Sequence, residues 1–124
     1  MDLFSEGEVL CIVGSVCLEG SREAHKIVRD AICRYNPAMV ISGGAVGVDS
    51  IAEWEAVQEL HVPFKKFPPD GVGWKHYRKR NLAMARACTR LVRIVSKRSK
   101  TYGSGWTRDR AAEMGKPTEE YVLD

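Results

Sequence analysis

Apolar and polar positions along the chain fall into blocks that predict strands followed by helices. Residues 8–15 ("EVLCIVGS") are mostly apolar and end in Gly14 and Ser15, a pattern typical of a buried parallel strand that leads into a loop. The next block, residues 21–35, has apolar side chains at helical spacing, with Ser21 as a predicted N-cap. These apolar positions are Ala24, Ile27, Val28, Ala31 and Ile32. A first strand–loop–helix unit is therefore predicted before Asn36.

The same order recurs directly afterwards. Residues 38–42 ("AMVIS") predict a second strand, residues 43–49 a glycine-rich loop, and residues 50–60 a helix. Ser50 and Glu53 have the spacing of a capping box at the start of that helix.

The remaining blocks extend the alternation. Residues 61–67 predict a shorter third strand, residues 76–88 a helix, and residues 90–96 ("RLVRIVS") a fourth strand. Thr107 is predicted to cap a helix over residues 108–115, and a last edge strand is expected at 118–123. This alternation predicts the α/β class: a Rossmann-like open parallel sheet of about five strands with helices on both faces.

Length and composition agree with one soluble domain. The chain has 124 residues, with 44% hydrophobic and 28% charged residues, and it contains no apolar run of the ~18 residues that a membrane span needs. We therefore expect a single domain over residues 1–124 with no membrane association. The acidic start lacks the basic region of a secretory signal, so we expect a cytoplasmic protein.

The four cysteines have no C-x-x-C spacing. We expect Cys11, Cys33 and Cys88 to be reduced core residues and Cys17 to lie in a loop. No metal site and no cofactor are predicted.

Charge is distributed unevenly. Residues 71–110 hold twelve Lys and Arg against one acid, Asp109, whereas residues 1–70 hold six against eleven acids. A segment of charge +11 either lines an anion site or forms a surface that meets polyanions, although a solvated basic surface is the ordinary outcome for most such side chains.

Three glycine-containing loops follow predicted strands, at residues 14–20, 43–47 and 103–105. In open parallel sheets, ligands bind at the carboxyl ends of the strands, so these loops are expected to gather at one edge. The glycine turn at 43–47 precedes a helix whose N-terminal amides favour an anion, and Asp49 braces the loop or orients a ligand hydroxyl. Ser15 is a further candidate contact to a phosphate or ribose.

The basic segment adds candidates for the same site. Arg80 lies on the line of the buried helix face with Met84, so its charge needs an anionic or hydrogen-bonding partner. Trp74 and Tyr77 precede it and are candidates for stacking on a base, although aromatic residues beside a turn are more often packing contacts.

Together these motifs resemble a known superfamily. "SGGAVGVDSIAEWEA", "WKHY", "RNLAM", "GSGWT" and "AAEMGKP" occur in order between about Val9 and Pro117. This arrangement resembles the SLOG superfamily of Rossmann-like ligand-binding domains, especially its small single-domain branch of YpsA-related proteins from bacteria and phages. The resemblance implies a pocket for a nucleotide or nucleotide-derived ligand, with Gly43, Gly44, Gly47 and Asp49, the pair Arg80 and Asn81, and Gly103, Gly105 and Thr107 matching its motifs.

The full set of predicted ligand-binding residues is Gly14, Ser15, Gly43, Gly44, Ala45, Gly47, Asp49, Trp74, Tyr77, Arg80, Asn81, Gly103, Ser104, Gly105 and Thr107. The favoured hypothesis is a sensor or sequestering domain for a nucleotide-like molecule, forming a homodimer or higher oligomer. The Lonely-guy phosphoribohydrolases of the same superfamily suggest N-glycosidic hydrolysis as an alternative, with Arg80 and Asp109 as catalytic residues. "TYGSGWTRD" departs from their motif, because it lacks the proline and carries Asp109 in place of glutamate.

Two further alternatives stay open. DNA binding, as in DNA-processing members of the superfamily, would use the basic segment and give affinity that falls steeply with salt. A purely structural subunit would retain the loops without a ligand.

Overall fold

The computed structural model describes residues 7–99 and 103–124 and has a five-stranded sheet in the order β3-β2-β1-β4-β5. The strands are β1 (Val9–Gly14), β2 (Met39–Ser42), β3 (Phe64–Lys66), β4 (Arg90–Ser96) and β5 (Thr118–Leu123), and every neighbouring pair is parallel. The predicted α/β class with an open parallel sheet of five strands is confirmed.

The strand order reverses at the centre of the sheet. The chain runs outward from β1 through β2 to β3, then crosses to the other side of β1 to form β4 and β5. Gly14, the last residue of β1, pairs with Ile94 of β4. This reversal beside β1 is the point at which open α/β sheets leave a crevice for ligands.

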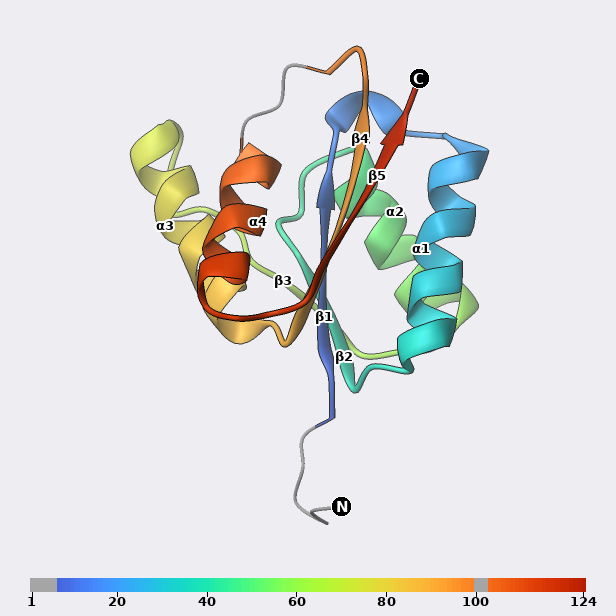
Figure 1. Cartoon of the computed structure of the whole chain (residues 1–124). Helices are drawn as coiled ribbons and strands as arrows, with labels where there is room; N and C mark the ends of the chain where they lie inside the picture. The colour runs from blue at the N-terminus through green and yellow to red at the C-terminus, as the bar shows by residue number, and fades with distance from the viewer. Residues whose placement is uncertain (1–6, 100–102) are drawn as a thin grey trace.

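Helices cover both faces of the sheet (Figure 1). One face carries α1 (Arg22–Tyr35) and α2 (Val48–Trp54), which continues as the π-helical segment η2 (Glu55–Glu59). The other carries α3 (Trp74–Ala87) and α4 (Gly103–Glu113). A short 3-10 helix, η1 (Val16–Leu18), follows β1. Each pair of helices encloses its own apolar cluster, one around Leu10, Ile12 and Val28 and the other around Cys11, Ile41 and Met84.

Several local predictions are confirmed. Strand β4 has the predicted bounds, and the predicted edge strand is β5. Ser21 is the N-cap of α1, since its side chain accepts a hydrogen bond from the backbone N–H of Ala24 at 3.1 Å. Asn36 ends that helix in the left-handed conformation, with φ of 44°.

Two predicted helix caps are wrong. Helix α2 begins at Val48 with Gly47 as N-cap, and Ser50 lies inside the helix, where its hydroxyl donates to the carbonyl oxygen of Gly47 at 2.8 Å. Thr107 also lies inside a helix, α4, and its hydroxyl donates to the carbonyl oxygen of Gly103 at 2.9 Å. In both cases the helix starts before the predicted cap, and the hydroxyl of that residue bonds back to a carbonyl oxygen three or four residues earlier.

The described residues also test the predictions for the cysteines and for membrane-spanning helices. Cys11 and Cys88 are buried and free, but Cys33 is exposed, so its expected place in the core is wrong. Cys33 lies on the outer side of α1, whose buried residues are Ala24, Val28, Ala31 and Ile32. Within residues 7–99 and 103–124, no helix combines the length and apolarity needed to cross a bilayer.

A buried carboxylate joins the two helices on the first face. Glu55 is 1% exposed and accepts a hydrogen bond from Nε of Arg29 at 2.9 Å, and its other oxygen lies 2.8 Å from Nδ1 of His25. Burial raises the pKa of Glu55, but the bonds to Arg29 and His25 lower it more, so that the pKa lies below its ordinary value of 4.5. The charge is retained in the fold because two side chains of α1 bind it.

Glu55→Gln is expected to lower the free energy of unfolding at pH 7 by on the order of 2 kcal/mol, because an amide cannot accept from both side chains of α1. The folded pKa lies below the unfolded one, so the stabilisation by the carboxylate is complete above about pH 4.5 and is lost as the pH falls further. Urea unfolding at pH 7, 5 and 4 tests this, with the exposed Glu19→Gln as control. An equal deficit at all three pH values would contradict the charge argument.

Candidate functional site

A cavity of about 660 Å³ opens at the carboxyl ends of β1 and β2, on the side of the sheet that α3 and α4 cover. Its walls come from the end of β1, the turn after β2, the chain after β3, and the first turns of α3 and α4. The lining residues are Val13, Gly14, Val16, Gly43, Gly44, Ala45, Asp49, Pro69, Trp74, Tyr77, Arg80, Asn81, Met84, Gly103, Ser104 and Thr107.

The three predicted glycine loops therefore meet at one cavity. Most of the predicted ligand-binding residues line it, from all the expected segments. Ser15, Gly47 and Gly105 are absent from the lining, and so is Asp109. The convergence of the loops is a property of the structure, and the binding role of each residue stays a prediction.

Atoms of the protein itself approach the glycine turn after β2. A Cβ atom on Gly43 would lie 2.6 Å from Nη1 of Arg80, and one on Gly44 would lie 2.6 Å from the side chain of Lys66. Gly47 has a φ of 86°, and a Cβ there would overlap the backbone of Ser15 and Val16. Packing against the rest of the chain is thus sufficient reason for these glycines.

One backbone amide of this turn and one at the start of α2 are already bonded within the protein. The N–H of Ala45 donates to Oδ2 of Asp49 at 3.2 Å, and the N–H of Val48, the first residue of α2, donates to the carbonyl oxygen of Ser15 at 3.2 Å. Asp49 braces the turn, one of the roles expected from the sequence. An anion against the start of α2 stays a prediction, because these two bonds occupy only part of the backbone donors there.

Arg80 projects from α3 into the wall of the cavity. Its Nη1 donates to the carbonyl oxygens of Gly43 at 2.9 Å and Phe67 at 3.2 Å, and its Nε donates to Oδ1 of Asn81 at 2.7 Å. Within residues 7–99 and 103–124, Nη2 has no hydrogen-bond partner. Through Nε and Nη1 the guanidinium holds the cavity wall together.

Asn81 is the next residue on α3 and is 5% exposed. Its Oδ1 is occupied by Arg80, whereas its Nδ2 has no partner in the described part of the chain. Nδ2 lies 3.5 Å from the position that a Cβ on Gly103 would take, at the junction of α3 and α4. Asn81 thus lines the cavity with an almost fully buried side chain whose oxygen is occupied by Arg80.

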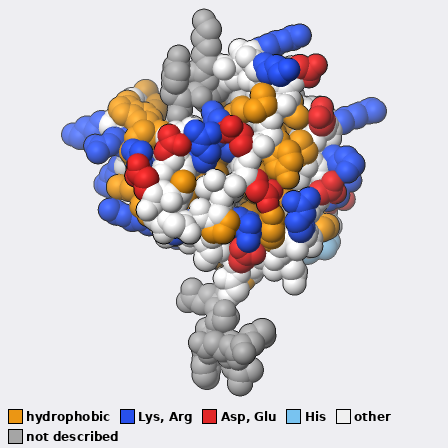
Figure 2. Space-filling view, viewed as in Figure 1, with side chains coloured by type: hydrophobic (Ala, Val, Ile, Leu, Met, Phe, Trp, Pro, Cys, Tyr) orange, Lys and Arg blue, Asp and Glu red, His pale blue; other side chains and the backbone are white. Residues whose placement is uncertain are grey.

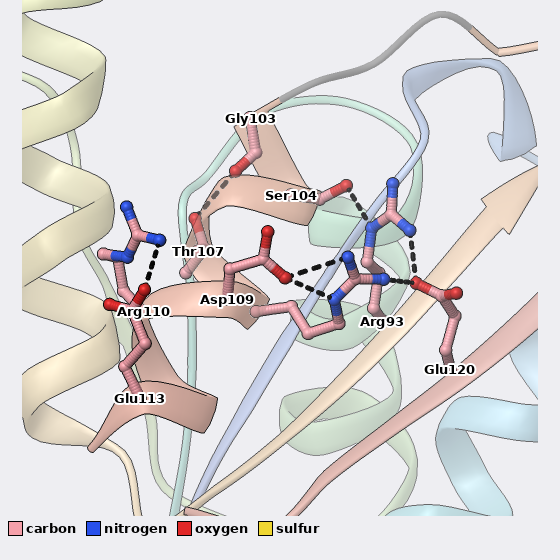
Figure 3. Close-up of polar contacts among 9 residues, drawn as sticks. Arg93, Gly103, Ser104, Thr107, Asp109, Arg110, Glu113 and Glu120 are labelled. Carbon is pink, nitrogen blue, oxygen red and sulfur yellow. Dashed lines mark hydrogen bonds and ion pairs between the residues drawn. The ribbon is translucent and has the colours of Figure 1, made fainter.

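Ser104 lines the cavity from the first turn of α4, and its hydroxyl oxygen accepts a hydrogen bond from Nε of Arg93 at 2.9 Å (Figure 3). Arg93 comes from β4 and is also paired with Glu120 of β5, which binds Arg108 as well. Because Arg93 donates to this oxygen, the hydroxyl proton of Ser104 remains available to a further acceptor. Neither Arg93 nor Glu120 was singled out in the sequence, since only the pairing of β4 with β5 brings them together.

The carboxylate of Asp109 points away from this wall and receives Nε and Nη2 of Arg108 at 3.1 and 3.0 Å. Figure 3 shows the Asp109 carboxylate directed away from α3, toward the side of α4 where Arg93 and Glu120 lie. The structure does not bring Asp109 and Arg80 to one cavity, because Asp109 is exposed on a helix whose buried residues include Ser104 and Thr107. The acid that does line the cavity is Asp49.

Two other predicted contacts have structural partners. The hydroxyl of Ser15 is fully buried and accepts the backbone N–H of Ser96 at 3.1 Å, which links β1 to the end of β4. Gly105 packs beside the guanidinium of Arg93. Among lining residues that the sequence did not propose as ligand contacts are Val13, Val16, Pro69 and Met84, which give no chemical signal because they are apolar.

The basic segment divides between internal pairs and one exposed face. Arg90, Arg93, Arg108 and Arg110 each pair with a carboxylate. Figure 2 shows Lys and Arg side chains gathered at the margin where α3 lies in Figure 1. On that helix Lys75, Arg78 and Arg86 are exposed. The excess charge of the segment is therefore partly neutralised within the fold.

Asp49→Asn is expected to raise the free energy of unfolding at pH 7. Burial raises the pKa of Asp49 above 3.8 despite its hydrogen bonds and the charge of Arg80, so the fold disfavours the ionised form. Protonation of Asp49 removes this cost of the buried charge. The extra stability of Asp49→Asn over the unmodified chain should therefore shrink as the pH falls toward 3.8. Thermal unfolding at pH 7, 5 and 4 measures it, and Asp49→Ala, which removes the acceptor for Ala45, should show no gain at pH 7.

Gly47→Ala is expected to lower the free energy of unfolding by about 3 kcal/mol or more, since the new Cβ meets the backbone of Ser15 and Val16 at a positive φ. Gly20→Ala is the matched control, because Gly20 has a φ of 78° but nothing within 4 Å of its Cβ position. That control should lose about 1–2 kcal/mol from the backbone conformation alone. Equal losses in chemical denaturation would refute the close approach.

Among the described residues, no group of three or more His, Cys, Asp or Glu side chains could hold a metal ion. No family model, curated protein or solved structure matches this chain.

Proposed function

We propose that the chain binds, in the cytoplasm, a nucleotide or nucleotide-derived molecule in the cavity at the carboxyl edge of its sheet, as a sensor or sequestering domain. The observation that carries the proposal is a set of donors without acceptors in the described part of the protein. Nη2 of Arg80, Nδ2 of Asn81 and the hydroxyl proton of Ser104 belong to three residues that line the cavity. Three donors, one of them cationic, favour a ligand group rich in acceptors, such as a phosphate.

The rest of the cavity is suited to an apolar or planar part of the same ligand. Trp74, Tyr77, Met84 and Val13 line it. Its volume of about 660 Å³ falls in the usual range for small-molecule sites, which is ~300–1,000 Å³. A phosphate joined to a ring system has both characters, and the resemblance to nucleotide-binding SLOG domains points to the same class.

Binding is proposed rather than hydrolysis because of how the carboxylates of Asp49 and Asp109 are placed. Hydrolysis by Arg80 and Asp109 requires both groups at one bond, but Asp109 is bound to Arg108 outside the cavity lining. Asp49 lines the cavity but is used as an acceptor by Ala45 in the glycine turn. Neither carboxylate is placed as a free catalytic base.

The test is calorimetric titration with the four ribonucleoside 5′-monophosphates, preceded by native mass spectrometry for a ligand that co-purifies. Ser104→Ala and Arg80→Lys should each weaken binding about ten-fold or more, since each removes a hydrogen bond to a charged ligand. Arg86→Lys is the matched control, because Arg86 is exposed on the same helix and is absent from the cavity lining. Its affinity should equal that of the unmodified chain.

Absence of binding to every nucleotide, with no co-purified ligand, would reject the proposal. Retention of DNA that weakens steeply with salt and is lost in Arg86→Ala would instead favour the exposed basic face of α3 as the functional surface. Affinity unaffected by Ser104→Ala and Arg80→Lys would place the ligand elsewhere.

A further inference from the structure

We infer that Trp74 is the stacking platform for the planar ring of the ligand, and that Trp106 and Arg110 of α4 hold it in place. The inference rests on the proposed function and names the part of the ligand that the donors leave unassigned. It assigns the base-binding end of the cavity to the junction of the first turn of α3 with α4. Neither Trp106 nor Arg110 lines the cavity.

The Trp74 side chain is partly exposed, and its orientation is fixed by a neighbouring ring. It is the first residue of α3, lines the cavity, and remains 48% exposed. Its ring meets the ring of Trp106 edge-on, with the centroids 5.6 Å apart and the planes at 90°. This T-shaped geometry is favourable for an aromatic pair and fixes the orientation of the exposed indole.

Trp106 is itself held from α4. The guanidinium carbon of Arg110 lies 5.0 Å from the centre of the Trp106 ring, and Nη2 of Arg110 donates to Glu113 at 2.7 Å. The buried Nε of Arg110 has no hydrogen-bond partner among the described residues, so the indole is the neighbouring group that offsets its burial. Arg110, Trp106 and Trp74 thus form a continuous row of contacts, cation–π and then edge-to-face, that ends at the cavity.

The other aromatic residue of the lining is less suited to this task. Tyr77 lies one turn after Trp74, and its ring already has the guanidinium carbon of Arg80 at 5.9 Å from its centre. A cation beside that ring competes with a base for it. Trp74 is therefore the aromatic ring of the cavity that is both oriented by the protein and open to a ligand.

The hydrogen-bond donors and Trp74 contact different parts of the ligand. Arg80, Asn81 and Ser104 take the anionic group, and Trp74 takes a flat, delocalised ring. Stacking depends on the π-face that all bases share, so Trp74 is expected to bind every nucleobase rather than select one. The class of ligand that fits both ends is a base-containing nucleotide rather than a sugar phosphate alone.

The experiment compares adenosine 5′-monophosphate with ribose 5-phosphate, which lacks the base, on the full chain by calorimetry. The nucleotide should bind about ten-fold or more tightly than the sugar phosphate. Trp74→Leu should remove that difference by weakening the nucleotide while leaving ribose 5-phosphate unchanged, and Trp74→Phe should retain most of it. Trp54→Leu is the control, since Trp54 is 50% exposed on α2, away from the cavity lining, and should change neither affinity.

The possible outcomes distinguish the stacking role of Trp74 from the binding of a nucleotide in the cavity. Equal binding of both compounds to the unmodified chain, or equal weakening of both by Trp74→Leu, would overturn the stacking role while the anion site stood. Failure of ribose 5-phosphate, adenosine monophosphate and the other three nucleotides to bind would reject the proposed function and the platform with it. A difference between the compounds that persists in Trp74→Leu would also overturn the inference.

Discussion

The site depends on one side chain, Arg80, which connects three segments that are distant in the sequence. Its guanidinium donates to the carbonyl oxygens of Gly43 after β2 and Phe67 after β3, and to the side chain of Asn81 on its own helix. A guanidinium can do this because its donors lie in one plane and it stays charged at every relevant pH. Without these bonds, two backbone oxygens at the cavity wall would lose a charged donor, and the turn after β2 would lose its contact with α3.

The close approach of other parts of the protein also requires the glycines of that turn. Arg80 reaches Gly43 only because no Cβ stands between them, and Gly47 lets the loop after β1 pack against the start of α2. Glycine-rich turns at strand ends are usually interpreted as openings for a phosphate. Here two of the amides around the turn bond to Asp49 and Ser15, so close packing within the protein explains the glycines without a ligand.

The sequence predicted what depends on periodicity and missed what depends on contacts between distant residues. The strands and the order of elements came from runs of apolar residues, and β4 matched to the residue. The predicted start of α4 was wrong. Threonine is a residue type that often caps helices, but Thr107 lies inside the helix and its hydroxyl donates to the carbonyl oxygen of Gly103. The same helix carries Asp109, which is exposed and bonded to Arg108, a contact that the sequence did not indicate.

The pairing of Arg93 with Ser104 could not be predicted from the sequence, and it determines how the Ser104 hydroxyl is used. A hydroxyl is a donor or an acceptor according to its neighbours, and nothing local to Ser104 tells which. The register of β5 on β4 puts Glu120 opposite Arg93, the carboxylate orients that guanidinium, and Arg93 then occupies the oxygen of Ser104 as donor. Asn81 is bonded to Arg80 through its oxygen in the same way, so the oxygens of both polar side chains at the α3–α4 junction are occupied by arginines. Contacts behind the cavity wall therefore determine which polar atoms of Asn81 and Ser104 are already occupied within the protein.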